Sequence, residues 1–188
     1  RHYDNIALCD QQVGAVLDAL EQDSLLDNTI IVFLSDHGDG LPRMKREIYD
    51  AGLKAPLIIR WPDKRSAGTV DDQLLSFVDM GPTTLSLAGV EPPEYLQGQA
   101  FTGRFPAQKQ RQYIYAARDR MDFHLDRRRA VKDKRFKYIK NYFPERPYIG
   151  DIAYRRNMGL MRELIRLHEE GELNEVQELW FRQTKPAE

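Results

Sequence analysis

The feature that most constrains the fold is an uninterrupted apolar run that ends abruptly in charged residues. Residues 30 to 34 read IIVFL, and Ser35 is then followed by Asp36 and His37. A strand buried on both faces of a parallel sheet has this continuous apolar pattern. In open α/β sheets, functional groups collect beyond the carboxyl ends of such strands. We therefore predict a strand over residues 29 to 35, and Asp36 and His37 either form the next loop or act as ligands held by a rigid strand.

Apolar spacing predicts a helix before this strand and a second strand after it. Five residues recur at spacings of three and four and form one apolar stripe: Ile6, Cys9, Val13, Leu17 and Leu20. This spacing predicts an amphipathic helix over residues 4 to 21 that lies on a sheet, with Cys9 in the core. The stretch APLIIRWP predicts a second buried strand that stops at Pro62. A helix followed by strands indicates an α/β layer.

The second half of the chain shows different patterns. Asp79 is placed to cap a helix that Gly89 would close. The stretches QYIYAARD and RRAVKDKRFKYIKN predict antiparallel strands with a turn at KDKR. Residues 152 to 181 predict one or two amphipathic helices, interrupted near Gly171. These elements indicate a small antiparallel unit with C-terminal helices.

A shift in composition at EPPEYLQGQAFTG suggests a domain boundary. We predict one domain over residues 1 to 95 and a C-terminal subdomain over residues 96 to 188. The predicted fold class is α/β. The first part contributes to a mostly parallel mixed sheet flanked by helices, and the second part is a small antiparallel sheet with a C-terminal helix.

Composition excludes several classes of protein. The 188 residues are 41% hydrophobic and 30% charged, which is typical of a globular protein, and no apolar stretch approaches the roughly 20 residues that span a bilayer. A formal charge of −1 gives no overall attraction to nucleic acid or membranes. A single cysteine excludes an internal disulfide framework and a cysteine-rich zinc site. We expect neither a nucleic-acid partner nor a membrane span.

The charge is unevenly distributed. Between residues 118 and 140 there are ten Lys or Arg residues and four Asp residues. One interpretation is the solvated face of a β-hairpin. The other is a basic wall that faces an anionic substrate, because clustered cations raise the local concentration of anions.

Several stretches, taken in order, resemble the second half of the sulfatase family, in the alkaline phosphatase superfamily. They are NTIIVFLSDHGD, Lys45, YDAGLKAPLIIRWP, SFVDMGPTTLSLAGV and LQGQAF, and they cover roughly residues 3 to 100. The stretch RRAVKDKRFKYIKN is similar to the hairpin of the family's small C-terminal subdomain. The resemblance implies an alkaline-phosphatase-like fold and hydrolysis of a sulfate ester on a sulfated carbohydrate, as in bacterial glycan sulfatases and sulfamidases.

The resemblance also implies roles for individual residues. Asp36 and His37 match two protein ligands of a calcium ion, with magnesium as the alternative metal. Imidazole is a poor calcium ligand, so His37 could instead donate a hydrogen bond to sulfate. Lys45 matches the catalytic lysine that bridges the sulfate and the nucleophile. We also consider Arg118, Arg120 and His124 as contacts to the substrate, with a solvated hairpin as the alternative.

The chain departs from the family at the nucleophile. Sulfatases use a formylglycine made from a Cys/Ser-x-Pro-x-Arg motif, and this motif does not occur in the sequence. The paired aspartates that supply other calcium ligands are also absent. We therefore expect a fragment of a larger periplasmic or extracellular enzyme, inactive alone, whose partner is the missing N-terminal part of the same domain. The alternatives are a phosphoester-cleaving member of the superfamily and a non-catalytic sulfatase-like domain.

Overall fold

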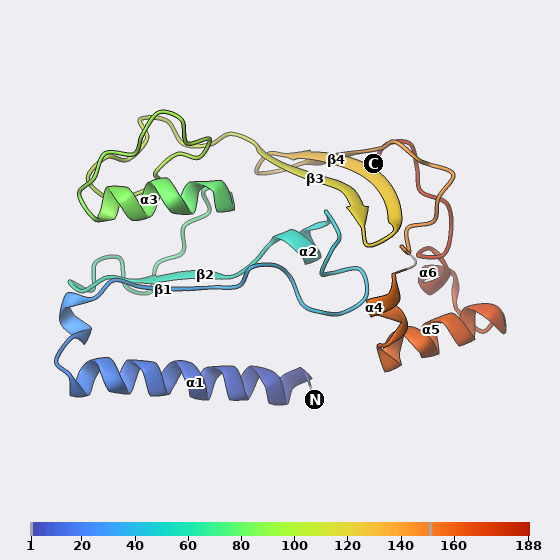
Figure 1. Ribbon diagram of the computed structural model, residues 1–188, viewed down its shortest axis with the longest axis horizontal. Helices are drawn as coiled ribbons and strands as arrows, with labels where there is room; N and C mark the ends of the chain where they lie inside the picture. The colour runs from blue at the N-terminus through green and yellow to red at the C-terminus, as the bar shows by residue number, and fades with distance from the viewer. Residues whose placement is uncertain (1, 151) are drawn as a thin grey trace. The chain divides into compact units, whose positions relative to one another are not determined.

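The computed structural model describes residues 2–150 and 152–188 (Figure 1). The chain divides into two compact units. The first unit contains the chain up to His37 together with Ala55–Val70. The second unit contains Gly38–Lys54 and Asp71–Glu188. The chain therefore leaves the first unit directly after His37 and returns to it at Ala55. The division predicted at residue 95 stays a prediction.

The first unit begins with the helix predicted from the apolar stripe. Helix α1 spans His2–Gln22, and a short 3-10 helix η1 (Leu26–Asn28) leads to strand β1 (Ile31–Leu34). The Arg60 guanidinium donates a hydrogen bond to the carbonyl oxygen of Leu26 at 2.7 Å, which ties η1 to strand β2 (Leu57–Arg60). The helix is confirmed. The placement of Cys9 in a core is wrong, because Cys9 is exposed.

Strands β1 and β2 pair antiparallel, with Ile31 opposite Arg60. Among the described residues both sheets are antiparallel, so the predicted parallel sheet is not seen. Parallel pairing needs a crossover connection, usually a helix, that returns the chain to the same end of the sheet. The only helix between β1 and β2 is α2 (Asp50–Leu53), which has four residues, and it belongs to the second unit.

The expected burial of both faces of β1 and β2 is also not seen. Val32 and Leu34 are each 37% exposed, and Ile58 is 62% exposed. A sheet of two strands has too few neighbours to cover both of its faces. The described part of the first unit contains no buried residue, so the buried side chains of the structure all lie in the second unit.

The second unit contains the predicted antiparallel sheet, with strand order β3-β4-β5. Its strands are β3 (Ile114–Met121), β4 (His124–Lys132) and β5 (Lys137–Asn141). The KDKR turn joins β4 and β5, and the Asp133 carboxylate stabilises it by accepting hydrogen bonds from the backbone N–H groups of Arg135 and Phe136. The hairpin prediction is confirmed. On one face of this sheet Ala130 and Ile139 form a small core with Ile48.

Helix α3 (Met80–Leu87) follows a 3-10 turn η2 (Phe77–Asp79), as the sequence predicted for this region. Asp79 makes no side-chain cap for α3. Its carboxylate instead accepts hydrogen bonds from the backbone of Ser76 and Gln99 and from the Arg111 guanidinium, because it is buried where these segments meet. Gly89, with φ 76°, ends the helix in the left-handed region that glycine tolerates.

Three helices complete the second unit: α4 (Ala153–Arg156), α5 (Gly159–Glu169) and α6 (Glu175–Glu178). The predicted interruption is confirmed at Gly171, which has φ 72°. The last residues pair with the free edge of β5, where the backbone of Ile139 and Glu188 exchanges two hydrogen bonds. No helix among the described residues is long and apolar enough to cross a membrane.

Candidate functional site

Asp36 and His37 lie directly after β1, as the sequence predicted. The Ser35 hydroxyl donates a hydrogen bond to the carbonyl oxygen of His37 at 2.7 Å, which closes a tight turn. The Asp36 carboxylate lies 3.3 Å from Nε2 of His37, and its side chain is 81% exposed. The turn therefore presents a carboxylate and an imidazole side by side at the end of a strand.

These two side chains fit part of a ligand set for a hard dication. Asp36 offers two carboxylate oxygens, whereas calcium prefers six to eight oxygen ligands. In the part of the chain that the structure describes, no group of three or more His, Cys, Asp or Glu side chains converges. Within the described chain, Asp36 and His37 would thus be a partial set of metal ligands.

Lys45 lies in a loop of the second unit whose backbone is packed unusually closely. Gly38 donates a hydrogen bond to the carbonyl oxygen of Gly52 at 3.0 Å, and Lys45 donates one to Asp39 at 2.9 Å. A Cβ atom on Gly38 would lie 1.8 Å from a backbone oxygen of Ala51, and one on Gly52 would lie 2.2 Å from a backbone oxygen. Only glycine permits this approach, so these two positions fix the course of the loop.

The backbone on both sides of Lys45 is strained. Arg43 has φ 65° and Arg46 has φ 75°, in the left-handed region that non-glycine residues rarely adopt. Each such residue costs about 1–2 kcal/mol. Strain of this kind persists only where surrounding contacts over-determine the conformation, and it gathers at functional sites.

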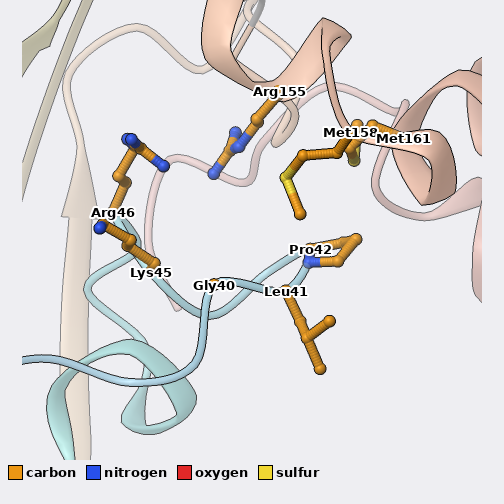
Figure 2. A pocket seen from close by; sticks show the side chains of 8 residues that line it. All are labelled: Gly40, Leu41, Pro42, Lys45, Arg46, Arg155, Met158 and Met161. Atoms are coloured by element: carbon orange, nitrogen blue, oxygen red, sulfur yellow. The ribbon is translucent and has the colours of Figure 1, made fainter. Parts of the chain in front are cut away.

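Lys45 lines a shallow hollow within the second unit (Figure 2). One side is formed by Gly40, Leu41, Pro42, Lys45 and Arg46, and the other by Arg155, Met158 and Met161. Three cations line the hollow, namely Lys45, Arg46 and Arg155. Among residues 2–150 and 152–188, no carboxylate pairs with Lys45 or Arg46, so the hollow attracts anions.

Beside the hollow lies a buried group of charges that we term the arginine cluster. Its members are Glu47, Arg118, Asp126, Arg128 and Arg155. The Glu47 carboxylate lies 2.6 Å from Arg118, 2.5 Å from Arg155 and 3.8 Å from Arg128. Asp126 lies 2.8 Å from Arg128 and 3.5 Å from Arg118. Every one of these side chains is at most 5% exposed.

Neutral neighbours allow these charges to pack closely. The Arg128 guanidinium lies over the Tyr148 ring, and that of Arg155 lies over the Trp180 ring, at 5.6 and 5.3 Å from the ring centroids. A Cβ atom on Gly150 would lie 2.8 Å from the Arg118 guanidinium, so glycine leaves the space that this group needs. Three arginines against two carboxylates leave the cluster with a net charge of +1.

The segment after Lys45 is also anchored to the sheet. Asp50 accepts hydrogen bonds from Lys132 at 2.5 Å and from Lys137 at 2.6 Å, and Lys137 donates to the backbone oxygen of Ile48. Burial alone would raise the pKa of Asp50, but the hydrogen bonds from the two lysines outweigh it and lower that pKa. The Tyr49 hydroxyl donates to the Glu188 carboxylate; burial and that negative charge raise the pKa of Tyr49.

The three predicted substrate contacts, Arg118, Arg120 and His124, differ in how deeply they are buried. Arg118 is buried in the arginine cluster. Arg120 is exposed and donates to the backbone oxygen of Asp122 at 2.8 Å, and His124 is half-buried at the start of β4. Arg118 and Arg128 therefore belong neither to a solvated hairpin face nor to an exposed basic wall. Contact of Arg118, Arg120 and His124 with a substrate stays a prediction.

The family resemblance also implies that Asp36 and His37 meet Lys45 at one site. This stays a prediction, because the first two belong to the first unit and Lys45 to the second. Sequence reasoning missed Glu47, Arg46 and Arg155. One usable signal was strand alternation, because Asp126, Arg128 and Ala130 share the buried face of β4. That pattern places two charged residues beside a core alanine and implies buried partners.

Comparisons with known proteins give a consistent result. A family model described as Sulfatase matches residues 1–90. An ulvan-active sulfatase of Formosa agariphila is 58% identical over 186 residues, which are 99% of this chain and 31% of that protein. An N-acetylglucosamine-6-O-sulfatase of Bacteroides thetaiotaomicron is 33% identical over 144 residues, which are 71% of this chain and 26% of that protein.

Solved structures agree with the sequence comparisons. A protein in complex with its substrate D-glucosamine-2-N,6-O-disulfate superposes with a TM-score of 0.65 at 28% identity, over 89% of this chain and 38% of that chain. The match confirms a mixed α/β architecture. The chain spans about a third, or less, of the length of the curated relatives it matches.

Proposed function

Because this chain belongs to the sulfatase family and covers part of the length of larger sulfatases, we propose that the intact protein is a carbohydrate sulfatase. Two similar proteins are named for activity on ulvan and on N-acetylglucosamine-6-O-sulfate groups, and a similar structure holds a sulfated glucosamine. The proposed reaction is hydrolysis of a sulfate ester, which yields inorganic sulfate and a sugar hydroxyl group.

The observation that carries this proposal is the placement of Lys45. It lines a hollow with two other cations, its loop is strained on both sides, and no carboxylate among the described residues neutralises it. A sulfate ester gains negative charge on its sulfuryl oxygens and on the departing oxygen as the bond breaks. A lysine held in this way stabilises that charge without reorganising.

We assign the metal and nucleophile by family. Asp36 and His37 would hold calcium, or magnesium, together with ligands from elsewhere in the protein, and the dication would act as a Lewis acid toward the sulfuryl oxygens. His37 could instead donate a hydrogen bond to sulfate. The nucleophile proposed is a formylglycine outside the printed sequence. Arg118, Arg120 and His124 are the proposed substrate contacts, and Arg118 also pairs with Glu47 and Asp126.

The first unit supports a larger sheet in the intact protein. Val32, Leu34 and Ile58 are apolar and more than a third exposed on a sheet of two strands. We propose that further strands of the same domain cover them and complete the mostly parallel, alkaline-phosphatase-like sheet. That part of the domain would also supply the remaining metal ligands. A periplasmic or extracellular location is proposed with it.

The test is to incubate the intact protein with a sulfated oligosaccharide and, separately, with a sugar phosphate. Sulfate and phosphate release are then measured by ion chromatography, with and without a chelator. We expect chelator-sensitive release of sulfate. Release of phosphate alone would assign the protein to the phosphoester-cleaving members, and release of neither ion would indicate a non-catalytic domain.

A further inference from the structure

We propose that Glu47 is a positioning residue that fixes Lys45 in its working geometry by anchoring the Lys45 loop to the arginine cluster. This inference rests on the proposed function of Lys45 and assigns a task to a residue outside the hollow. Glu47 lies two residues after Lys45 and is 3% exposed.

The contacts of Glu47 reach three separate elements of the second unit. Its carboxylate pairs with Arg118 on β3, Arg128 on β4 and Arg155 on α4. These partners are 71, 81 and 108 residues away in sequence, taken as differences of residue number. The carboxylate therefore holds the loop at one point relative to a sheet and a helix together.

One residue separates Glu47 from Lys45, and backbone hydrogen bonds hold both of them. The Glu47 N–H donates to the carbonyl oxygen of Met44 at 3.0 Å, and the Lys45 N–H donates to that of Asp39 at 2.9 Å. Between them lies Arg46, with φ 75°, a conformation that relaxes unless both ends of the turn are held. Glu47 holds the C-terminal end of that turn.

The Glu47 carboxylate also holds one of the side chains that line the hollow. Glu47 binds the guanidinium of Arg155, and Arg155 and Lys45 line the hollow from opposite sides. If Glu47 lost its charge, Arg155 would be released and left unbalanced within a buried group of arginines. Both the course of the Lys45 loop and the opposite side of the hollow therefore depend on one carboxylate.

The matched control is Asp79, another buried carboxylate in the second unit. Asp79 is 1% exposed, pairs with Arg111 and makes no contact with the Lys45 loop among its hydrogen bonds. Glu47→Gln and Asp79→Asn each remove one buried negative charge and keep the side-chain shape. A purely structural role for Glu47 predicts similar behaviour of the two variants.

The experiment is a kinetic double-mutant cycle in the intact protein, on a sulfated oligosaccharide. We expect Glu47→Gln to lower kcat by about tenfold or more with a smaller change in KM, and Asp79→Asn to leave kcat within about twofold at equal loss of Tm. In a Lys45→Ala background, Glu47→Gln should lower kcat only slightly further, because Glu47 acts through Lys45. A full additional loss in that background, or equal loss of kcat in Asp79→Asn, would overturn the proposal.

Two further measurements keep the test decisive. If Glu47→Gln does not fold, Glu47→Asp takes its place, because it keeps the charge and shortens its reach. Glu47→Asp should lower kcat by a smaller factor, and this loss should again largely disappear in the Lys45→Ala background. If the intact protein releases no sulfate, the proposed function fails, and amide hydrogen exchange at Lys45 and Glu47 decides the positioning role. Faster exchange in Glu47→Gln than in Asp79→Asn supports the role, and equal exchange rejects it.

Discussion

The two units hold their proposed site residues in opposite ways. Asp36 in the first unit is on an exposed turn after a two-stranded sheet, and no described residue of that unit is buried. Lys45 in the second unit is on a loop fixed by close glycine contacts, by the arginine cluster and by the ion pairs of Asp50 with Lys132 and Lys137, which we term the Asp50 clamp. The difference is that the described second unit fixes the surroundings of Lys45 by its own contacts, whereas we propose that Asp36 is completed by further strands and ligands of the same domain.

The largest expected effect comes from the exposed turn of the first unit. In the intact protein, Asp36→Ala should lower bound calcium and sulfate release below detection, since a carboxylate ligand is lost. The control is Asp63→Ala, which removes an exposed carboxylate from the same unit. Metal content is measured by atomic emission. Normal calcium content in Asp36→Ala would end the assignment of Asp36 as a ligand.

The next effect concerns the buried charges of the second unit. Arg128→Ala should destabilise the protein by about 3–5 kcal/mol, because Asp126 and Glu47 lose a partner inside the core. Urea unfolding gives the free energy, with Arg127→Ala on the exposed face of β4 as the control. If Arg128→Ala and Arg127→Ala lowered the free energy of unfolding by the same small amount, the arginine cluster would not stabilise this unit.

A smaller effect would show whether the first unit is covered in the intact protein. Ile58 is 62% exposed on β2, so in the absence of further cover Ile58→Ser should change the free energy of unfolding by less than about 0.5 kcal/mol. If further strands pack on this sheet, the loss should reach about 1–2 kcal/mol. We expect the larger value from urea unfolding of the intact protein. The smaller value would contradict the proposed extension of the sheet.

The smallest effect is the pH dependence of the Asp50 clamp. The pKa of Asp50 is lowered from its ordinary value of 3.8, so its contribution is present above that value and is lost as pH falls through the lowered pKa. The contribution should be about 0.5 kcal/mol, because the carboxylate is half exposed. Unfolding of wild type and Asp50→Asn is compared from pH 6 to pH 2. A difference that persists at pH 2 would show that the clamp is not ionic.

The local elements could be predicted from the sequence because their signals are local. Helix α1, the β4–β5 turn and the break at Gly171 follow from apolar spacing and turn chemistry. The sheet containing β1 and β2 was predicted to be mixed and mostly parallel, whereas among the described residues these two strands pair antiparallel. A continuous apolar run indicates burial in the finished sheet, and it carries no information on the direction of the partner strand.

The candidate site could be predicted only in part. Asp36, His37 and Lys45 could be proposed from the sequence because short motifs resemble those of a known family, and their roles stay predictions. Glu47 was missed because its partners Arg118 and Arg155 are distant in sequence, and a charged residue is exposed by default. The basic stretch that begins at Arg118 was taken as one surface, whereas alternation along β3 and β4 divides it between a buried and an exposed face.

The most direct test of the account is the rate of sulfate release by Lys45→Ala in the intact protein. Lys109→Ala, which removes an exposed lysine from the same unit, is the control. We expect Lys45→Ala to keep its bound metal and its Tm and to lower kcat by about 10²–10³-fold, as loss of a group that stabilises transition-state charge does. Lys109→Ala should match wild type. Normal turnover of a sulfated oligosaccharide by Lys45→Ala would contradict the account.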